Sequence, residues 1–287
     1  MTCHIRLFWL IIAFAVVAQA QQTTTTTPDK VREALATQTC LEADVTVCRY
    51  DYTSNSLAVE AISFRPARPG RFPGILMIPG FQRTAVDLIP LGLALAREGF
   101  ASVGVTQPGF GKSEGKADYV GPNTLRALTE GYRRFQSESY VERRKMGVYG
   151  YSRGGMAASL LAVKLDDVGA AVFGAGVYDF KKAHDDVSIE GIRLNMERES
   201  GMTEQAIRER SSVFQMERLK CPVLILHGDK DENVPVTQAY LLRDRLTELK
   251  KDFEIKIFPG LPHSIGTENV TKYTLDFFKR RLLNAKN

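Results

Sequence analysis

The chain has 287 residues, of which 44% are hydrophobic and 25% are charged, a balance typical of a globular protein. Its formal net charge is +5, but the basic residues are scattered, and each basic cluster lies near acidic neighbours. No basic run is interleaved with aromatic residues, so the sequence gives no support to nucleic-acid binding.

The first twenty residues have the pattern of a secretory signal peptide. Arg6 precedes an apolar run from Leu7 to Val17, and the small residues Ala18 and Ala20 follow. This run is shorter than the roughly 20 apolar residues that a membrane span needs. We therefore expect cleavage after Ala20, a secreted or extracytoplasmic protein, and no stable membrane insertion after cleavage. An uncleaved anchor is the alternative.

The rest of the chain divides into a leader and one domain. Residues 21–40 contain a polar, low-complexity stretch that cannot bury a core, and we expect them to form a flexible leader. Residues 41–287 have the length of one large α/β domain. Strand-like and helix-like segments alternate along them, with apolar strands expected at 74–80, 100–105, 145–151, 168–177, 223–226 and 253–258.

This alternation predicts a doubly wound, mainly parallel sheet with helices on both faces. Two further strands, 45–52 and 57–62, are expected to form a hairpin before it, and a helix opening near Tyr273 is expected to end the chain. In such sheets the active site lies beyond the carboxyl ends of the strands.

The cysteines predict one disulfide. Cys3 leaves with the signal peptide, and Cys40 and Cys48 lie close together near the start of the fold. Cys221 adjoins an apolar run typical of a buried strand. In an exported protein we therefore expect a Cys40–Cys48 bridge and a buried free thiol at Cys221. The cysteine spacing suggests no metal site.

The stretch Gly150-Tyr151-Ser152-Arg153-Gly154-Gly155 has the form of a strand, a tight turn and a helix with a serine at the apex. Glycines two residues before and after Ser152 allow the strand and the helix to approach closely. The turn also places Ser152 at a helix N-terminus, where unpaired N–H groups favour negative charge. This arrangement suits a nucleophile for acyl transfer.

An acid and a histidine follow in the chain order Ser, Asp, His. The turn after the 223–226 strand offers three acidic side chains, of which Asp231 is our first choice and Asp229 the second. His263 lies in a Pro- and Gly-rich loop after the last strand. We expect His227 to be a turn residue bonded to backbone, and His184 to lie at the surface.

These residue types suit acyl transfer through a covalent intermediate. An imidazole can accept the serine proton and later protonate the leaving group, and a carboxylate can fix the imidazole tautomer. The backbone N–H groups of Phe81 and Arg153 are expected to form the oxyanion hole. We expect no cofactor and no metal.

From Val45 to Leu283 the chain resembles the α/β-hydrolase-fold serine hydrolases. The elbow, the spacing His227-Gly228-x-x-Asp231-x-x-Val234-Pro235, and the segment 107–115 are similar to two branches. One is the dienelactone-hydrolase-like and acyl-esterase group, and the other is the catalytic domain of prolyl-oligopeptidase-type peptidases.

The resemblance implies that Ser152 is the nucleophile, Asp231 the acid and His263 the base, with Phe81 and Arg153 as oxyanion donors. The chain departs from the family pattern at two places. Pro79-Gly80 stands where members often have His-Gly, and Gln107 stands where they often have an acid.

Three functions are compatible with these motifs. We expect a carboxylic-ester hydrolase acting on a small-molecule ester. The alternative is a peptidase or amidase of the prolyl-oligopeptidase type, although about 25 residues between the signal and the first strand, without blade-like repeats, leave no room for a propeller. A non-catalytic binding protein on the same fold is less favoured, because it would not need all three groups.

The segment 180–214 lies where this family often inserts a lid, and it has apolar residues on one side and charged residues on the other. We expect it to form short helices over Ser152 that shape the substrate pocket. A helix pair packed on the core is the alternative.

Overall fold

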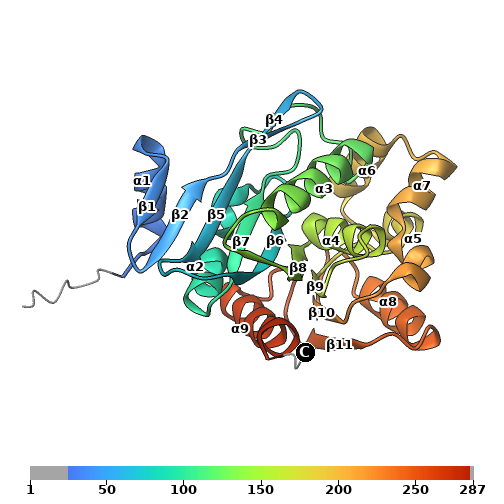
Figure 1. Ribbon diagram of the computed structural model, residues 1–287. Helices are drawn as coiled ribbons and strands as arrows, with labels where there is room; N and C mark the ends of the chain where they lie inside the picture. The colour runs from blue at the N-terminus through green and yellow to red at the C-terminus, as the bar shows by residue number, and fades with distance from the viewer. Residues whose placement is uncertain (1–24, 285–287) are drawn as a thin grey trace, which may run out of the picture.

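The computed structural model describes residues 25–284 as a twisted sheet enclosed by helices (Figure 1). The strands are β1 (Cys40–Glu42), β2 (Val45–Arg49), β3 (Tyr52–Ser54), β4 (Leu57–Val59), β5 (Ala61–Pro66), β6 (Phe72–Ile78), β7 (Ala101–Val105), β8 (Val141–Tyr151), β9 (Ala170–Gly174), β10 (Val223–Gly228) and β11 (Phe253–Phe258). The α-helices are α1 (Pro28–Thr37), α2 (Ile89–Arg97), α3 (Pro122–Gln136), α4 (Arg153–Lys164), α5 (Phe180–Asp186), α6 (Glu190–Ser200), α7 (Glu204–Arg210), α8 (Thr237–Glu248) and α9 (Thr267–Phe278). Shorter turns are the 3₁₀ helices η1 (Ala85–Leu88) and η2 (Ser212–Arg218) and the π-helical turn η3 (Lys279–Leu283).

The main sheet has the strand order β1-β2-β5-β7-β6-β8-β9-β10-β11. Neighbouring strands from β7 to β11 in this order run parallel, whereas β1, β2 and β5 are antiparallel to their neighbours. The predicted doubly wound, mainly parallel sheet is therefore confirmed. Because the parallel strands point the same way, the loops after β6, β8, β10 and β11 emerge at one edge, where a site can form.

Two hydrophobic cores cover the two faces of the sheet. Along β6, Leu76 and Ile78 belong to the core beneath α3, α4 and α8, whereas Ile75 and Met77 belong to the core beneath α1, α2 and α9. Side chains along a strand alternate between its two faces. Every residue of β6 is buried, as expected for a strand covered on both sides. Among residues 25–284, no helix is both long and apolar enough to cross a membrane.

The leader prediction is wrong for part of its length. Residues 28–37 form helix α1, in which the Thr27 side chain accepts a hydrogen bond from the Lys30 N–H and Pro28 occupies the first turn. Val31 and Leu35, one helical turn apart, are buried against the sheet-facing core. The polar run before Pro28 obscured this short apolar stripe in the sequence. The predicted signal segment, residues 1–20, lies outside the described residues.

The strands predicted near the N-terminus differ from those in the structure. The expected pair 45–52 and 57–62 is split into β2 and β5 in the main sheet and a separate two-stranded sheet of β3 and β4. The turn between β3 and β4 places Asn55 and Ser56 at positive φ, which is the geometry of a tight hairpin turn. At the other end, α9 begins at Thr267 and not near Tyr273.

The Cys40–Cys48 disulfide is present, and it joins residues directly opposite each other on β1 and β2. Cys221 carries a free thiol and is buried just before β10. Burial raises the pKa of this thiol to about 12. The Cys221 thiol is therefore a packing group and not a reactive thiolate at neutral pH.

Thiol titration tests this assignment. Protein produced from Gln21 onward should show one thiol per chain when it is denatured without reductant, and three after reduction. The Cys221→Ser variant should show none before reduction. Three thiols in the unreduced wild-type chain would contradict the bridge.

Candidate active site

Ser152 sits on a strained turn between β8 and α4. Its φ of 58° and ψ of −126° lie in a region that L-residues rarely adopt. Side chains at Gly150 and Gly154 would overlap the backbone carbonyls of Gly154 and Ile78, respectively. The Ser152 N–H donates to the Gly174 carbonyl at 2.8 Å. These contacts hold the strained turn and lift the Ser152 hydroxyl above the sheet edge.

The structure brings Ser152, His263 and Asp231 into one hydrogen-bonded chain. His263 Nε2 lies 2.8 Å from Ser152 Oγ, and His263 Nδ1 lies 2.7 Å from Asp231 Oδ2. The carboxylate can only accept, so Nδ1 carries the hydrogen and Nε2 is free to accept the serine proton. This is the arrangement that a serine nucleophile and its general base require.

The loop that carries His263 is held at several points. Tyr151, next to the serine, donates from its hydroxyl to the His263 carbonyl at 2.6 Å. Burial raises the pKa of Tyr151 well above its ordinary value, so the phenol stays protonated and continues to donate. Asp229 Oδ1 accepts the Gly260 N–H at 2.6 Å. Asp229, our second choice of acid, therefore braces the loop and does not contact the imidazole.

Asp231 is surrounded by donors. Its Oδ1 accepts the N–H groups of Asn233 and Val234, each at 2.9 Å. Its Oδ2 lies 2.7 Å from His263 Nδ1 and 3.1 Å from His227 Nε2. Burial opposes ionisation, but the hydrogen bonds from His227, His263 and Val234 outweigh it and lower the pKa of Asp231 to about 2. Asp231 is therefore a carboxylate at any pH at which the imidazole can act as a base.

Two backbone segments flank Ser152 where an oxyanion would form. Arg153 is the first residue of α4, so its N–H has no acceptor within the helix. The loop after β6 passes close to the serine, since a Cβ added at Gly80 would lie 3.3 Å from Ser152 Cβ. Phe81 follows in this loop, and both Phe81 and Arg153 line the cavity that contains Ser152. This placement is compatible with the predicted oxyanion donors.

Gln107 is hydrogen-bonded to the loop after β6. It stands where the family often has an acid, and it is fully buried. Its Nε2 donates to the Pro79 carbonyl at 2.8 Å, which a carboxylate could not do. The two departures from the family pattern, Pro79 and Gln107, are thus in direct contact.

Ser152 and His263 open into a cavity of about 760 Å³. Phe81 and Tyr151 lie beside the serine, while Ile192 and Asn195 of α6 form part of another wall. The short helices expected at 180–214 are present as α5, α6 and α7, and α6 borders the cavity. Such a volume suits a small molecule or a short peptide.

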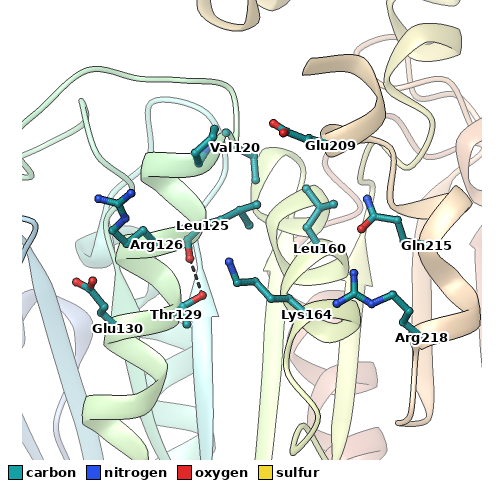
Figure 2. A pocket seen from close by; sticks show the side chains of 12 residues that line it. Val120, Leu125, Arg126, Thr129, Glu130, Leu160, Lys164, Glu209, Gln215 and Arg218 are labelled. Atoms are coloured by element: carbon teal, nitrogen blue, oxygen red, sulfur yellow. Dashed lines mark hydrogen bonds between the residues drawn. The ribbon is translucent and has the colours of Figure 1, made fainter. Parts of the chain in front are cut away.

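A second cavity of about 550 Å³ lies between α3, α4 and the 3₁₀ helix η2 (Figure 2). Arg126, Lys164 and Arg218 line it together with Glu130 and Glu209. It lies away from Ser152 and His263 and offers no paired nucleophile and base among its described lining residues.

Two histidines lie in other surroundings than the sequence predicts. His227 lies within β10 and is fully buried, with Nε2 2.9 Å from the Val234 carbonyl and 3.1 Å from Asp231. The backbone contact was predicted, but the contact with Asp231 was not, because a spacing of four residues indicates a contact on a helix and not at the end of a strand. His184 is half-buried and lies 2.9 Å from Glu197 on α6.

The fold and this geometry agree with the comparisons to known proteins. Residues 113–284, more than half of the chain, match the sequence profile of the prolyl oligopeptidase family. The chain belongs to this family. It is thus a hydrolase of the serine hydrolase class, and the resemblance seen in the sequence is confirmed.

The proteins that this chain resembles differ in length and in the activity that their names state. The chain is 29% identical over 225 residues to the uncharacterized peptidase YtmA of Bacillus subtilis, covering 76% of this chain and 85% of that protein. Pyrococcus horikoshii acylaminoacyl peptidase has a TM-score of 0.73 at 18% identity, over 90% of this chain and 44% of that one. The acetyl xylan esterase from Paenibacillus sp. R4 has a TM-score of 0.69 at 15% identity, over 83% and 85%. The chain thus spans less than half of the acylaminoacyl peptidase but most of YtmA and the esterase.

Replacing each of the two acids separates their roles. Asp231→Asn should lower kcat by about 10⁴-fold, because an amide cannot hold the imidazole in the tautomer that accepts the serine proton. Asp229→Asn, which alters the brace at Gly260, should stay within about tenfold of wild type. Steady-state kinetics with p-nitrophenyl acetate measure both. A larger loss in Asp229→Asn than in Asp231→Asn would reverse the assignment.

The lowered pKa of Asp231 also predicts a dependence of stability on pH. Because the folded-state pKa is depressed from 3.8 to about 2, the stabilisation is present above about pH 4 and is lost as the pH falls towards 2. The free energy of unfolding of wild type minus that of Asp231→Asn should therefore shrink by about 2 kcal/mol over this interval. Urea denaturation at pH 7, 4, 3 and 2 measures it. A constant difference would show that the Asp231 carboxylate does not stabilise the fold.

Proposed function

We propose that this chain is a serine peptidase or amidase that cleaves amide bonds in short peptides or acylated amino acids through an acyl-enzyme on Ser152. The hydrogen-bonded chain of Ser152, His263 and Asp231, in a member of the prolyl oligopeptidase family, carries the proposal. The substrate is a small molecule that fits the cavity of about 760 Å³ above the serine.

The first half of the reaction forms the acyl-enzyme. Ser152 Oγ attacks the scissile carbonyl carbon while its proton passes to His263 Nε2. The carbonyl oxygen becomes an oxyanion, which the N–H groups of Phe81 and Arg153 stabilise. Asp231 stabilises the imidazolium that forms. His263 then gives the proton to the departing amine nitrogen as the C–N bond breaks.

The second half hydrolyses the acyl-enzyme. A water molecule occupies the place vacated by the amine, loses a proton to His263 Nε2 and attacks the acyl carbon. The second tetrahedral intermediate uses the same oxyanion donors. It collapses when His263 returns the proton to Ser152 Oγ, so that the carboxylic acid leaves and the free serine is regenerated.

The peptidase alternative is better supported than the ester hydrolase that we favoured from the sequence. The matched profile describes a prolyl oligopeptidase family, and YtmA, most of whose length the chain covers, is named a peptidase. Amide hydrolysis is the more demanding reaction, because the poor amine leaving group must be protonated. His263, whose Nε2 lies 2.8 Å from Ser152 Oγ and which lines the cavity with it, can supply that proton.

Ester hydrolysis is the second candidate. One observation favours it: the acetyl xylan esterase has the same fold over a similar length of chain. The same groups would act on an ester, whose alkoxide leaves more readily. A protein of the proposed function should therefore also hydrolyse activated esters.

A substrate panel tests the proposal. Aminoacyl-, prolyl- and acetyl-aminoacyl-p-nitroanilides should be compared with a p-nitrophenyl ester series of increasing chain length. Wild type should turn over at least one nitroanilide, and Ser152→Ala should lose about 10⁶-fold in kcat on it. Ser188→Ala, an exposed serine outside the cavity lining, should match wild type.

Two results would count against the proposal. Turnover of esters with no Ser152-dependent turnover of any nitroanilide would return the function to ester hydrolysis. Absence of both activities, with no covalent labelling of Ser152 by a fluorophosphonate, would favour the non-catalytic binding protein.

A further inference from the structure

The side chain of Arg153 is buried beside the candidate nucleophile. It is 2% exposed and lies 2.5 Å from the Glu199 carboxylate, which is 7% exposed. Its guanidinium carbon lies 4.6 Å from the ring centre of Tyr119, 5.1 Å from Phe110 and 5.7 Å from Phe81. Within the described residues, Nε and Nη1 have no hydrogen-bond partner. The aromatic faces and one carboxylate therefore balance this cation.

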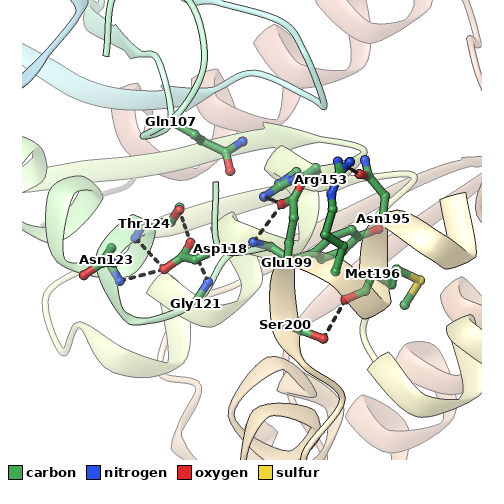
Figure 3. Close-up of polar contacts among 12 residues, drawn as sticks. Gln107, Asp118, Gly121, Asn123, Thr124, Arg153, Asn195, Met196, Glu199 and Ser200 are labelled. Atoms are coloured by element: carbon green, nitrogen blue, oxygen red, sulfur yellow. Dashed lines mark hydrogen bonds and ion pairs between the residues drawn. The ribbon is translucent and has the colours of Figure 1, made fainter. Parts of the chain in front are cut away.

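Glu199 ties this cation to helix α6. The same Glu199 oxygen that pairs with Arg153 accepts the Tyr119 N–H at 3.1 Å. Figure 3 shows Arg153 beside Glu199, with Asn195 farther along the same helix. Ile192, Asn195 and Glu199 follow one another at helical spacing. One side of α6 therefore borders the cavity at Ile192 and Asn195. The same side carries Glu199, which forms the ion pair with Arg153.

Among the described residues, few other contacts hold helix α6 in place. Met196 is 1% exposed, but Leu194 is 49% exposed. The Arg193–Glu197 pair lies within the helix and is partly exposed, so it contributes little to holding α6 on the fold, whereas Glu197 also lies 2.9 Å from His184 of α5. Tertiary packing supplies most of the stability of a helix in a protein. The buried contact at Glu199 is thus a main attachment of α6 to the rest of the fold.

We propose that Arg153, through its buried ion pair with Glu199, is a positioning residue that holds α6 against the nucleophile elbow as a wall of the substrate cavity. The ion pair fixes the distance between Ser152 and the cavity residues of α6. It acts on how the substrate is held, and the proton transfers remain with His263. The kinetic part of this proposal rests on the proposed function, whereas the part on α6 does not.

The proposal makes a prediction about Glu199→Met. The methionine keeps the length of the side chain but leaves the Arg153 guanidinium and the Tyr119 N–H without their acceptor, so α6 should loosen. Amide hydrogen exchange in peptides covering 190–200 should become at least tenfold faster. KM for the best peptidyl nitroanilide should rise about tenfold, while kcat on p-nitrophenyl acetate, which has only a small acetyl group to position, should stay within about threefold.

Two further variants act as controls. Glu199→Gln retains an oxygen that accepts from Arg153 and Tyr119, so it should recover most of the KM and of the exchange protection. It also provides the test if Glu199→Met does not fold, with exchange about threefold faster than in wild type. Glu190→Met removes a carboxylate that is 75% exposed on the same helix and should stay within twofold of wild type in both measurements.

The outcomes are separable. Unchanged exchange of α6 in Glu199→Met would overturn the proposal, whatever the enzyme hydrolyses. So would an equal loss of kcat on both substrates with unchanged KM, since that would indicate a general structural defect. If wild type cleaves no nitroanilide, the proposed function fails, but faster exchange of α6 would still support the positioning role of the ion pair.

Discussion

The backbone conformation of Ser152 is the constraint on which the rest of the site depends. A positive φ at a non-glycine residue is costly, and it persists only where neighbouring structure enforces it. Here Gly150 and Gly154 allow β8, α4 and the end of β6 to meet without side chains between them. The turn directs the hydroxyl towards His263 and points the start of α4 at the same space. The proposed nucleophile and the proposed oxyanion donor thus both depend on the conformation of one strained residue.

The topology of the sheet explains why distant segments meet at this turn. Ser152 and His263 lie 111 residues apart, and Asp231 is 32 residues before His263. Each follows the carboxyl end of a parallel strand, and β8 and β11 are separated in the sheet by β9 and β10. The loop after β11 must therefore reach back across two strands. Tyr151 and Asp229 bind the backbone of that loop and keep the imidazole over the serine.

The sequence predicted the parts of the site that depend on local pattern and chain order. The elbow, the acid after β10 and the histidine after β11 each follow a recognisable strand, so their positions could be inferred. His227 and Glu199 could not, because their roles depend on side-chain contacts that tertiary packing creates. Helix α1 was missed since two buried residues, Val31 and Leu35, are too few to give a clear period beside a threonine run.

The disulfide lies at the opposite edge of the sheet from the loop of His263. It fixes the pairing of strands β1 and β2. Cys40 and Cys48 face each other across β1 and β2, so the bond prevents β1 from slipping by a residue along its neighbour. A three-residue edge strand has little hydrogen bonding to hold it. With the bond reduced, β1 could detach and leave the backbone of β2 open to another chain. The Cys40–Cys48 bond thus keeps β1 paired along the edge of the sheet, so that the edge of β2 stays covered.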